Sequence, residues 1–151
     1  LESARRREAG YRAALQAAGI AFDPDLVRVG GFTQETAEAP ARELLTIADR
    51  PTAVFAANDL SAIQTMRTAA ELGIEIPADL SVVGFDNIPE SALTDPPLTT
   101  VDQSIQALGH EAVRTLVELI EHPERHDAAD PIHITLPTKL VIRRSSASPR
   151  R

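Results

Sequence analysis

Four side chains that could hold a small polar molecule each lie at or just beyond the end of an apolar run typical of a β-strand. They are Phe32, Asn58, Asp86 and Gln103. A carboxylate accepts hydrogen bonds from hydroxyl groups, an amide both donates and accepts, and an aromatic ring covers the apolar face of a sugar or a heterocycle. In open α/β sheets, ligands bind outside the carboxyl ends of the strands. The four residues therefore predict a site for a polar, neutral small molecule at one edge of a sheet.

Catalytic chemistry is harder to build from this sequence. It places no nucleophile beside a base, has no Gly-x-Gly-x-x-Gly or Walker loop, and holds no Asp, Glu and His cluster at metal-ligand spacing. His122 and His126 are four residues apart, but Pro123 interrupts the helix that a metal pair would need. Asp86 alone could serve as a general base, so an α/β enzyme stays open as an alternative. We expect a protein that is not an enzyme and that uses no metal and no cofactor.

The composition limits the class of protein and its partners. A chain of 151 residues is long enough for one domain with a hydrophobic core. A formal charge of −7 argues against general binding to nucleic-acid phosphates. The absence of cysteine excludes disulfides and thiolate nucleophiles and fits a reducing compartment. Since we find no signal peptide and no apolar run of about 18 residues, we expect the piece itself to be soluble. We also expect a cytoplasmic location and no membrane partner.

The apolar run from Leu80 to Phe85 organises the expected fold. β-branched residues lie at its centre and it carries no charge, as in a strand covered on both faces of a parallel sheet. Further strands are expected at residues 26–29, 53–57, 98–101, 132–136 and 139–143, and helices at residues 3–19, 34–48, 60–72 and 104–121. This order predicts an α/β fold with an open, mostly parallel sheet flanked by helices.

Some residues within these elements carry specific expectations. Pro40 lies inside the second predicted helix and should kink it or begin a new helical segment. Asn58 should cap the helix that follows it, although its amide could also turn towards a ligand. Arg5, Arg6 and Arg7 crowd the first turns of the first helix, where positive charges oppose the helix dipole. At least one of these arginines should therefore have a specific acceptor.

Five stretches of the chain carry a resemblance to a known family. They are residues 3–11, 51–59, 80–86 and 96–103, and the pairs Leu108-Gly109 and Ala112-Val113. In this order and spacing they resemble the effector-binding region of the lactose/galactose repressor (LacI/GalR) family of bacterial transcription regulators, over nearly the whole chain. The resemblance implies a two-lobed core shaped like the periplasmic sugar-binding proteins, with a small-molecule effector held between the lobes.

The resemblance also implies how the chain divides. Residues 1–103 correspond to the C-terminal lobe, and residues 104–136 to a helix and a strand of the N-terminal lobe. Residues 137–144 correspond to a last strand that returns to the C-terminal lobe. The residues at the end of the chain, 145–151, are expected from the sequence itself to be a frayed tail. The apolar face of the helix at 104–121 should then be an exposed patch or an intermolecular contact.

Residue roles follow from the same resemblance. Arg7 would hydrogen-bond the effector, Phe32 would stack on it, Asn58 and Asp86 would make polar contacts, and Gln103 would contact it where the chain crosses between lobes. The effector is expected to be a sugar rather than a purine. A homodimer would use the helix from Asp59 through Ile63 and the segment from Leu93 to Pro97.

Two departures from the family pattern matter. The chain begins at Leu1 rather than Met, and both the DNA-binding segment and nearly all of the first lobe are absent, so we expect a piece of a longer protein. Operator DNA would be bound only through the absent helix-turn-helix. Also absent is a strand that would lie between residues 26–30 and 53–57. We expect these two segments to pair directly, or to recruit a strand from another copy, unless the chain is a proteolysed remnant.

The leading functional hypothesis is effector sensing by a regulator, in which ligand binding shifts the affinity for operator DNA. The alternative is a periplasmic-type sugar-binding protein of a transport system, which shares the two-lobed fold. The run from Pro96 to Gln103 favours the regulator.

Overall fold

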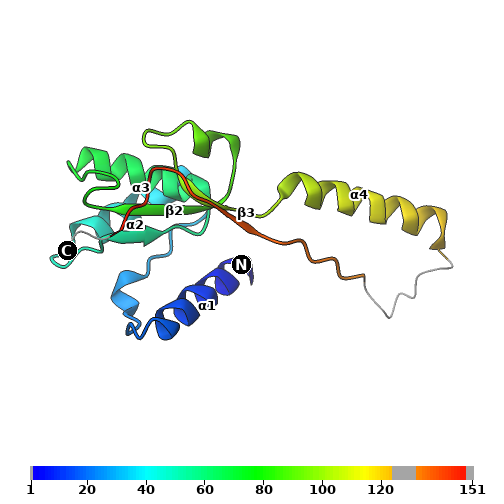
Figure 1. The fold of residues 1–151 in the computed structure, drawn as a ribbon, viewed down its shortest axis with the longest axis horizontal. Coiled ribbons are helices and arrows are strands. Elements are labelled where there is room, and N and C mark those ends of the chain that lie inside the picture. The colour runs from blue at the N-terminus through cyan, green and yellow to red at the C-terminus, as the bar shows by residue number, and fades with distance from the viewer. Residues whose placement is uncertain (1, 124–131, 149–151) are drawn as a thin grey trace.

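A four-stranded sheet forms the centre of the fold in the computed structural model, which describes residues 2–123 and 132–148 (Figure 1). The strands are β1 (Ala53–Phe55), β2 (Ser81–Asp86), β3 (Thr99–Asp102) and β4 (Lys139–Val141), in that spatial order. β1 is parallel to β2 and β2 to β3, whereas β4 runs antiparallel to β3. The predicted open, mostly parallel α/β sheet is confirmed.

Helix α3 (Asp59–Glu71) packs on β2 and contributes several residues of the hydrophobic core. Its apolar side chains Ala62, Met66 and Ala69 recur at helical spacing and are buried against Leu80 and Val82, which are 0% exposed. Full burial of one such leucine contributes about 1.5–3 kcal/mol to stability. The core therefore lies between α3 and the sheet rather than around α1.

Helix α2 (Gln34–Thr46) packs against α3 and begins with a capping box. Thr33 Oγ1 accepts from the backbone N–H of Thr36 at 3.2 Å, and Thr36 Oγ1 accepts from the backbone N–H of Thr33 at 3.3 Å. The helix continues past Pro40 as a single element, so no new helical segment begins there. The buried stripe that includes Ala37, Ala41 and Leu44 holds both halves against α3 and offsets the hydrogen bond that proline cannot make.

The strand expected at residues 26–29 does not form. Pro24–Leu26 make a 3-10 turn, residues 27–30 join no strand of the sheet, and the side chain of Val29 is 93% exposed. A cavity of about 370 Å³ separates this segment from β1, and both border it. Without a partner within reach a strand has no ladder, so β1 is an edge strand and the expected direct pairing of 26–30 with 53–57 is wrong.

The C-terminal segment differs from expectation at both of its ends. Residues 132–138 are outside any ladder, so the strand expected at 132–136 is absent from the described residues. The tail expected to fray from residue 145 is instead fastened to the sheet: Ser145 Oγ donates to the carbonyl of Val82 at 2.6 Å and accepts from the N–H of Thr99 at 2.8 Å. Ser145 is 0% exposed, and its hydroxyl satisfies one backbone group of β2 and one of β3. Residues 149–151 of that predicted tail, like residues 124–131, lie outside the described part.

Two helices stand apart from the core. Helix α1 (Glu2–Ala17) has no buried residue, and α4 (Ile105–Glu121) projects away from the sheet as an arm (Figure 1). Along α4, Val113 is 62%, Leu116 56% and Ile120 70% exposed, which confirms that its apolar face is an exposed patch. Within the described residues, no helix is long and apolar enough to cross a membrane.

Candidate ligand-binding site

The carboxyl ends of β2 and β3 bring together an acid and an amide. Asp86 is the last residue of β2 and pairs in register with Asp102 of β3, so Gln103, the next residue, follows β3 at the same edge. Gln103 Nε2 donates a hydrogen bond to Asp86 Oδ1 at 2.6 Å. The parallel register of these two strands thus places two groups that can bind hydroxyls next to each other.

Arg7 reaches this pair from α1. Its Nη2 lies 3.7 Å from Asp86 Oδ1, its Nη1 donates to the carbonyl oxygen of Ala57, and its Cζ lies 3.9 Å from the centre of the Phe85 ring. The side chains of Arg7 and Asp86 are 14% and 21% exposed, so water screens this pair less than a surface pair. The sequence predicted a specific acceptor for one of the three arginines, and Arg7 has one in the carbonyl of Ala57, just beyond β1, together with an ion-pair partner in Asp86.

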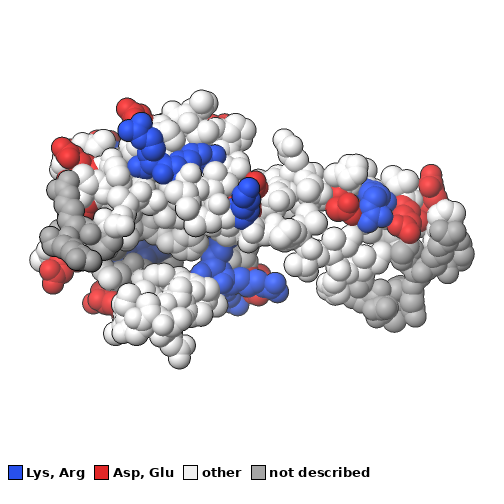
Figure 2. All heavy atoms as spheres, viewed as in Figure 1, with Lys and Arg blue, Asp and Glu red and all other residues white. Residues whose placement is uncertain are grey.

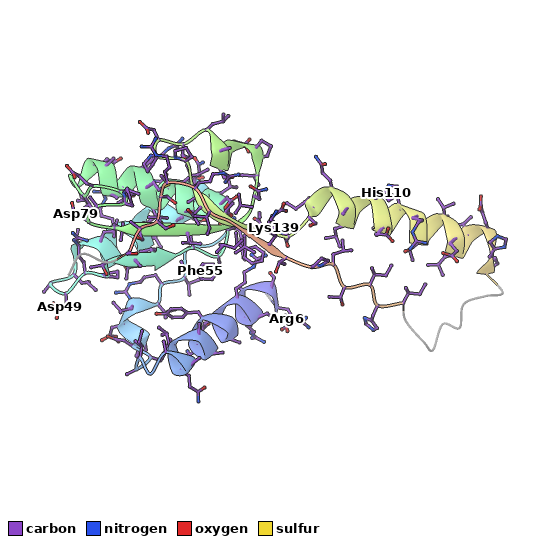
Figure 3. The ribbon with its side chains drawn as sticks, viewed as in Figure 1. Arg6, Asp49, Phe55, Asp79, His110 and Lys139 are labelled. Carbon is purple, nitrogen blue, oxygen red and sulfur yellow. The ribbon has the colours of Figure 1, made fainter. Side chains whose placement is uncertain are left out.

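The neighbouring arginines have no such role. Arg6 lies 3.1 Å from Glu2 on its own helix and its side chain is 81% exposed; Figure 3 labels it on the outer side of α1. Arg5 is exposed as well. Figure 2 shows basic side chains gathered where the first turns of α1 meet the sheet.

The Asp86 carboxyl has an unusual environment. Burial raises its pKa above the ordinary value of 3.8, the charge of Arg7 opposes this rise, and the charge of Asp59 adds to it. The backbone is also uncommon, because Asp86 and Asn87 have φ angles of 116° and 56°, in the region that favours glycine. Residues with such backbone strain cluster at active sites, ligand clamps and switch regions.

Asn58 has a structural task in this arrangement. It is 5% exposed, its Oδ1 accepts from the N–H of Ser61 at 3.0 Å, and its Nδ2 donates to the carbonyl of Phe32 at 2.9 Å. The first bond caps α3, as the sequence predicted. The second fastens Phe32 to the start of α3, so both polar groups of Asn58 are used within the chain.

Phe32 lies on a cavity of about 370 Å³ between α1, α2, the 26–31 segment and β1. Arg7, Tyr11 and Phe55 line the same cavity, whereas Asp86 and Gln103 do not. In Figure 3, Phe55 is labelled on the side of β1 that faces α1. Arg7 therefore borders both an aromatic cavity and the Asp86–Gln103 pair, and it joins the two parts of the predicted site.

Comparison with known proteins shows the family to which the chain belongs. The profile of the family described as Periplasmic binding protein-like domain matches residues 1–146. The chain belongs to that family. The relatives that it matches are transcriptional regulators, LacI-type proteins among them. Curated relatives include the HTH-type transcriptional regulator CelR of Thermobifida fusca, 38% identical over 136 residues, and the HTH-type transcriptional repressor PurR of Mannheimia succiniciproducens, 37% identical over 143 residues. These matches take in 90% and 95% of this chain but only 39% and 42% of the relatives' length.

Solved structures show the same LacI-type fold. A CelR–cellobiose complex superimposes with a TM-score of 0.85 at 38% identity, covering 93% of this chain and 42% of the other. A LacI-family regulator of Enterococcus faecium with bound ribose gives a TM-score of 0.86 at 32% identity, covering 95% of this chain and 52% of the other. The chain thus spans about half or less of these LacI-type proteins, and the relatives named here are regulators rather than enzymes.

The residues expected at a LacI-type dimer contact fall into two groups. Asp59 is 0% and Ile63 5% exposed, because both side chains pack inside the chain between α3 and the sheet. They are therefore not surface residues in this structure. Leu93 is 82% exposed and Pro97 is half-buried, so these two remain available to a partner.

Sequence reasoning missed the buried carboxylate of Asp59, which it treated as a dimer contact. Its Oδ2 accepts from the N–H of Ile88 at 2.9 Å and its Oδ1 from Thr100 Oγ1 at 2.5 Å. Burial raises the Asp59 pKa above 3.8, and these hydrogen bonds lower it in part. The sequence did hold one clue to this close packing, because a glycine inside a strand often marks the close approach of another group, and Gly84 lies inside the run that forms β2. A Cβ at Gly84 would clash with Asp59 Oδ1.

Phe85, the ring under Arg7, was also missed as a site residue. Its place in the apolar run marked it as core. In the described residues, 2–123 and 132–148, no group of three or more His, Asp or Glu side chains could hold a metal ion.

Proposed function

We propose that this chain is the effector-sensing part of a LacI-type transcriptional regulator. Binding of a small polar molecule at the strand ends changes the affinity of the full protein for operator DNA, with no bond made or broken. The observation that carries this proposal is the convergence of Arg7, Asp86 and Gln103 from α1, β2 and β3 at one edge of a parallel sheet.

The effector of this proposal is a sugar. A carboxylate with a guanidinium on one side and an amide on the other offers acceptors and donors to a row of hydroxyl groups. The aromatic cavity beside Arg7 supplies rings that cover the apolar face of a pyranose. Cellobiose and ribose are the ligands of the two similar structures. PurR relatives at similar identity make a purine the competing ligand class in the test.

The proposal also assigns the segments of the chain to two lobes. Residues 1–103 and 137–144 form the C-terminal lobe, and residues 104–136 belong to the N-terminal lobe. The exposed apolar face of α4 supports this division, because an apolar helix face of this kind is stable when another layer covers it. The cavity along β1 supports a further strand between β1 and the 26–30 segment, preceding α1.

The remaining parts of the proposal concern the full protein. A helix-turn-helix outside this chain binds operator DNA in the cytoplasm. A homodimer forms through the surface that includes Leu93 and Pro97; the 82% exposure of Leu93 supports it.

Calorimetric titration of the full protein with cellobiose, ribose, other sugars and purine bases tests this function. A bound sugar at 100 times its Kd should also raise the free energy of unfolding by about 2.7 kcal/mol. Binding of a sugar that then changes operator affinity in a gel-shift assay supports the proposal. Binding of a purine alone would move the effector to the other class, and no binding by any compound would contradict effector sensing.

A further inference from the structure

The turn that carries the candidate ligand-binding carboxylate has two consecutive residues in the left-handed region. Asp86 has φ 116° and Asn87 has φ 56°, and neither is glycine. Such a turn costs free energy and persists only where the surrounding structure holds it in place. The contacts that hold this turn therefore determine where the Asp86 side chain points.

One guanidinium joins this turn to two other segments. Arg143 Nη2 donates to Asn87 Oδ1 at 2.7 Å. The other branch of the same group, Nη1, donates to the carbonyl of Leu98 at 2.7 Å and to Ser91 Oγ at 3.0 Å. Because the guanidinium is planar and rigid, it fixes the distance between the turn after β2 and the start of β3.

Arg143 is itself firmly placed. It lies two residues beyond β4, and its backbone N–H donates to Thr99 Oγ1 at 3.0 Å. The other side of the turn is tied down by Asp59, whose Oδ2 accepts from the N–H of Ile88 at 2.9 Å. Asn87 is thus held by the guanidinium of Arg143, and Ile88 is held by the buried carboxylate of Asp59. The Asp86 side chain faces Arg7 and Gln103.

We propose that Arg143 is a positioning residue for ligand binding: through Asn87 it holds the turn that aims the Asp86 carboxylate at the site. This inference rests on the proposed function, since it assigns Asp86 to the ligand. The three acceptors of the guanidinium, on Asn87, Ser91 and Leu98, lie outside the Asp86–Arg7–Gln103 cluster. Arg143 therefore acts through Asn87 rather than by touching the ligand.

The test uses two ways of breaking the contact and one way of keeping it. Arg143→Met removes the donor. Asn87→Gly removes the acceptor but adopts the left-handed backbone without strain, and Asn87→Asp keeps an acceptor and tolerates that backbone. Arg144→Met is the control, because Arg144 is the adjacent arginine and is exposed.

Cellobiose and ribose affinities are measured by calorimetry on the full protein. We expect Arg143→Met and Asn87→Gly each to weaken binding at least tenfold. The double variant should be no weaker than Arg143→Met, because that substitution already breaks the contact that Asn87→Gly removes. Asn87→Asp should stay within about threefold of the unaltered protein, and Arg144→Met should match it.

A ligand-free measurement separates failure of this inference from failure of the proposed function. Hydrogen exchange should rise in residues 86–91 of Asn87→Gly and stay unchanged in α3, which a general loss of stability would not produce. If neither these two sugars nor the other sugars of the titration bind the unaltered protein, the proposed sugar class fails and the exchange result still decides the inference. Unchanged exchange at 86–91, or additive losses of affinity in the double variant, would overturn it; should Arg143→Met not fold, Asn87→Gly decides alone.

Discussion

Arg7 Nη2 lies 3.7 Å from Asp86 Oδ1, so an ion pair joins the first helix to the end of the second strand. No residue of α1 is buried. This pair, together with the bond from Arg7 to the carbonyl of Ala57, therefore holds α1 by polar contacts at the very place where a ligand would bind. A molecule that displaces or tightens this contact would change the position of α1 as well as the site.

Replacing Arg7 with methionine should loosen α1 and weaken ligand binding together. The substitution leaves Asp86, which is 21% exposed, without its cation, and we expect a loss of about 1–2 kcal/mol in the free energy of unfolding. Proteolysis within α1 measures the loosening of the helix, urea denaturation measures the loss of stability, and calorimetric titration of the full protein with cellobiose and ribose measures ligand binding. Arg6→Met is the matched control, because Arg6 pairs only with Glu2 of its own helix among its described contacts. If Arg7→Met and Arg6→Met showed equal proteolysis and equal stability, Arg7 would not be the residue that holds α1 in place.

The Asp86 carboxyl should make stability depend on pH in a defined direction. Its pKa is raised in the folded state, so between 3.8 and that raised value the folded chain binds more protons than the unfolded chain. The free energy of unfolding should therefore rise as the pH falls through this interval. At pH values above the raised pKa, the ionised Asp86 carboxylate should lower the stability of the folded chain. Asp86→Asn should flatten this part of the curve and leave the part due to Asp59.

Urea denaturation at a series of pH values between neutrality and 3.8 measures the effect. Asp49→Asn is the control: Asp49 is an exposed residue ahead of β1, at the opposite edge of the sheet, and Figure 3 labels it there. If Asp86→Asn kept the same pH dependence as the unaltered chain, the raised pKa of Asp86 would be wrong.

Gly84 should not tolerate a side chain. A Cβ at this position would lie 2.2 Å from Asp59 Oδ1 and 3.1 Å from Leu98 Cδ2, and both atoms belong to buried residues. We expect Gly84→Ala to lower the free energy of unfolding by about 1–3 kcal/mol. Gly109→Ala in α4 meets no heavy atom within 4 Å and should be neutral or stabilise by up to about 1 kcal/mol. Chemical denaturation compares the two, and a neutral Gly84→Ala would mean that Asp59 does not fill this space.

The two hydrogen bonds of Asn58 can be separated. Asn58→Ala removes the cap of α3 and the link to Phe32, and should cost about 1–2 kcal/mol in the free energy of unfolding. Asn58→Asp keeps the capping oxygen but loses the donor to Phe32, so it should retain most of the stability and still loosen residues 30–33. Thermal unfolding and hydrogen exchange distinguish these effects. Similar exchange at 30–33 in Asn58→Asp and the unaltered chain would show that the link to Phe32 is unimportant.

Local patterns were enough to predict most elements of the fold. The uncharged run at 80–85 predicted β2, and the cap at Asn58 predicted the start of α3, because both depend on neighbouring residues. Residues 26–29 have the composition of a strand but no partner for a ladder. The tail at Ser145 is ordered by bonds to Val82 and Thr99, whose positions the sequence does not reveal.

The candidate site divides in the same way. That Asp86 and Gln103 meet could be predicted, because parallel strands that are adjacent in a sheet end at one edge. The burial of Asn58 and Asp59 could not, because it depends on contacts with Phe32, Ile88 and Thr100 from three other segments. Polar residues at strand ends therefore indicate where a site lies, whereas long-range hydrogen bonds decide which of them can reach a ligand.

A comparison of sugar binding by the unaltered full protein and by Asp86→Asn tests the central claim most directly. Calorimetry with cellobiose and ribose should give a measurable Kd for at least one sugar, a loss of at least tenfold in Asp86→Asn, and no change in Asp49→Asn. Unchanged sugar affinity in a folded Asp86→Asn protein would contradict the claim that the ends of β2 and β3 form the ligand-binding site.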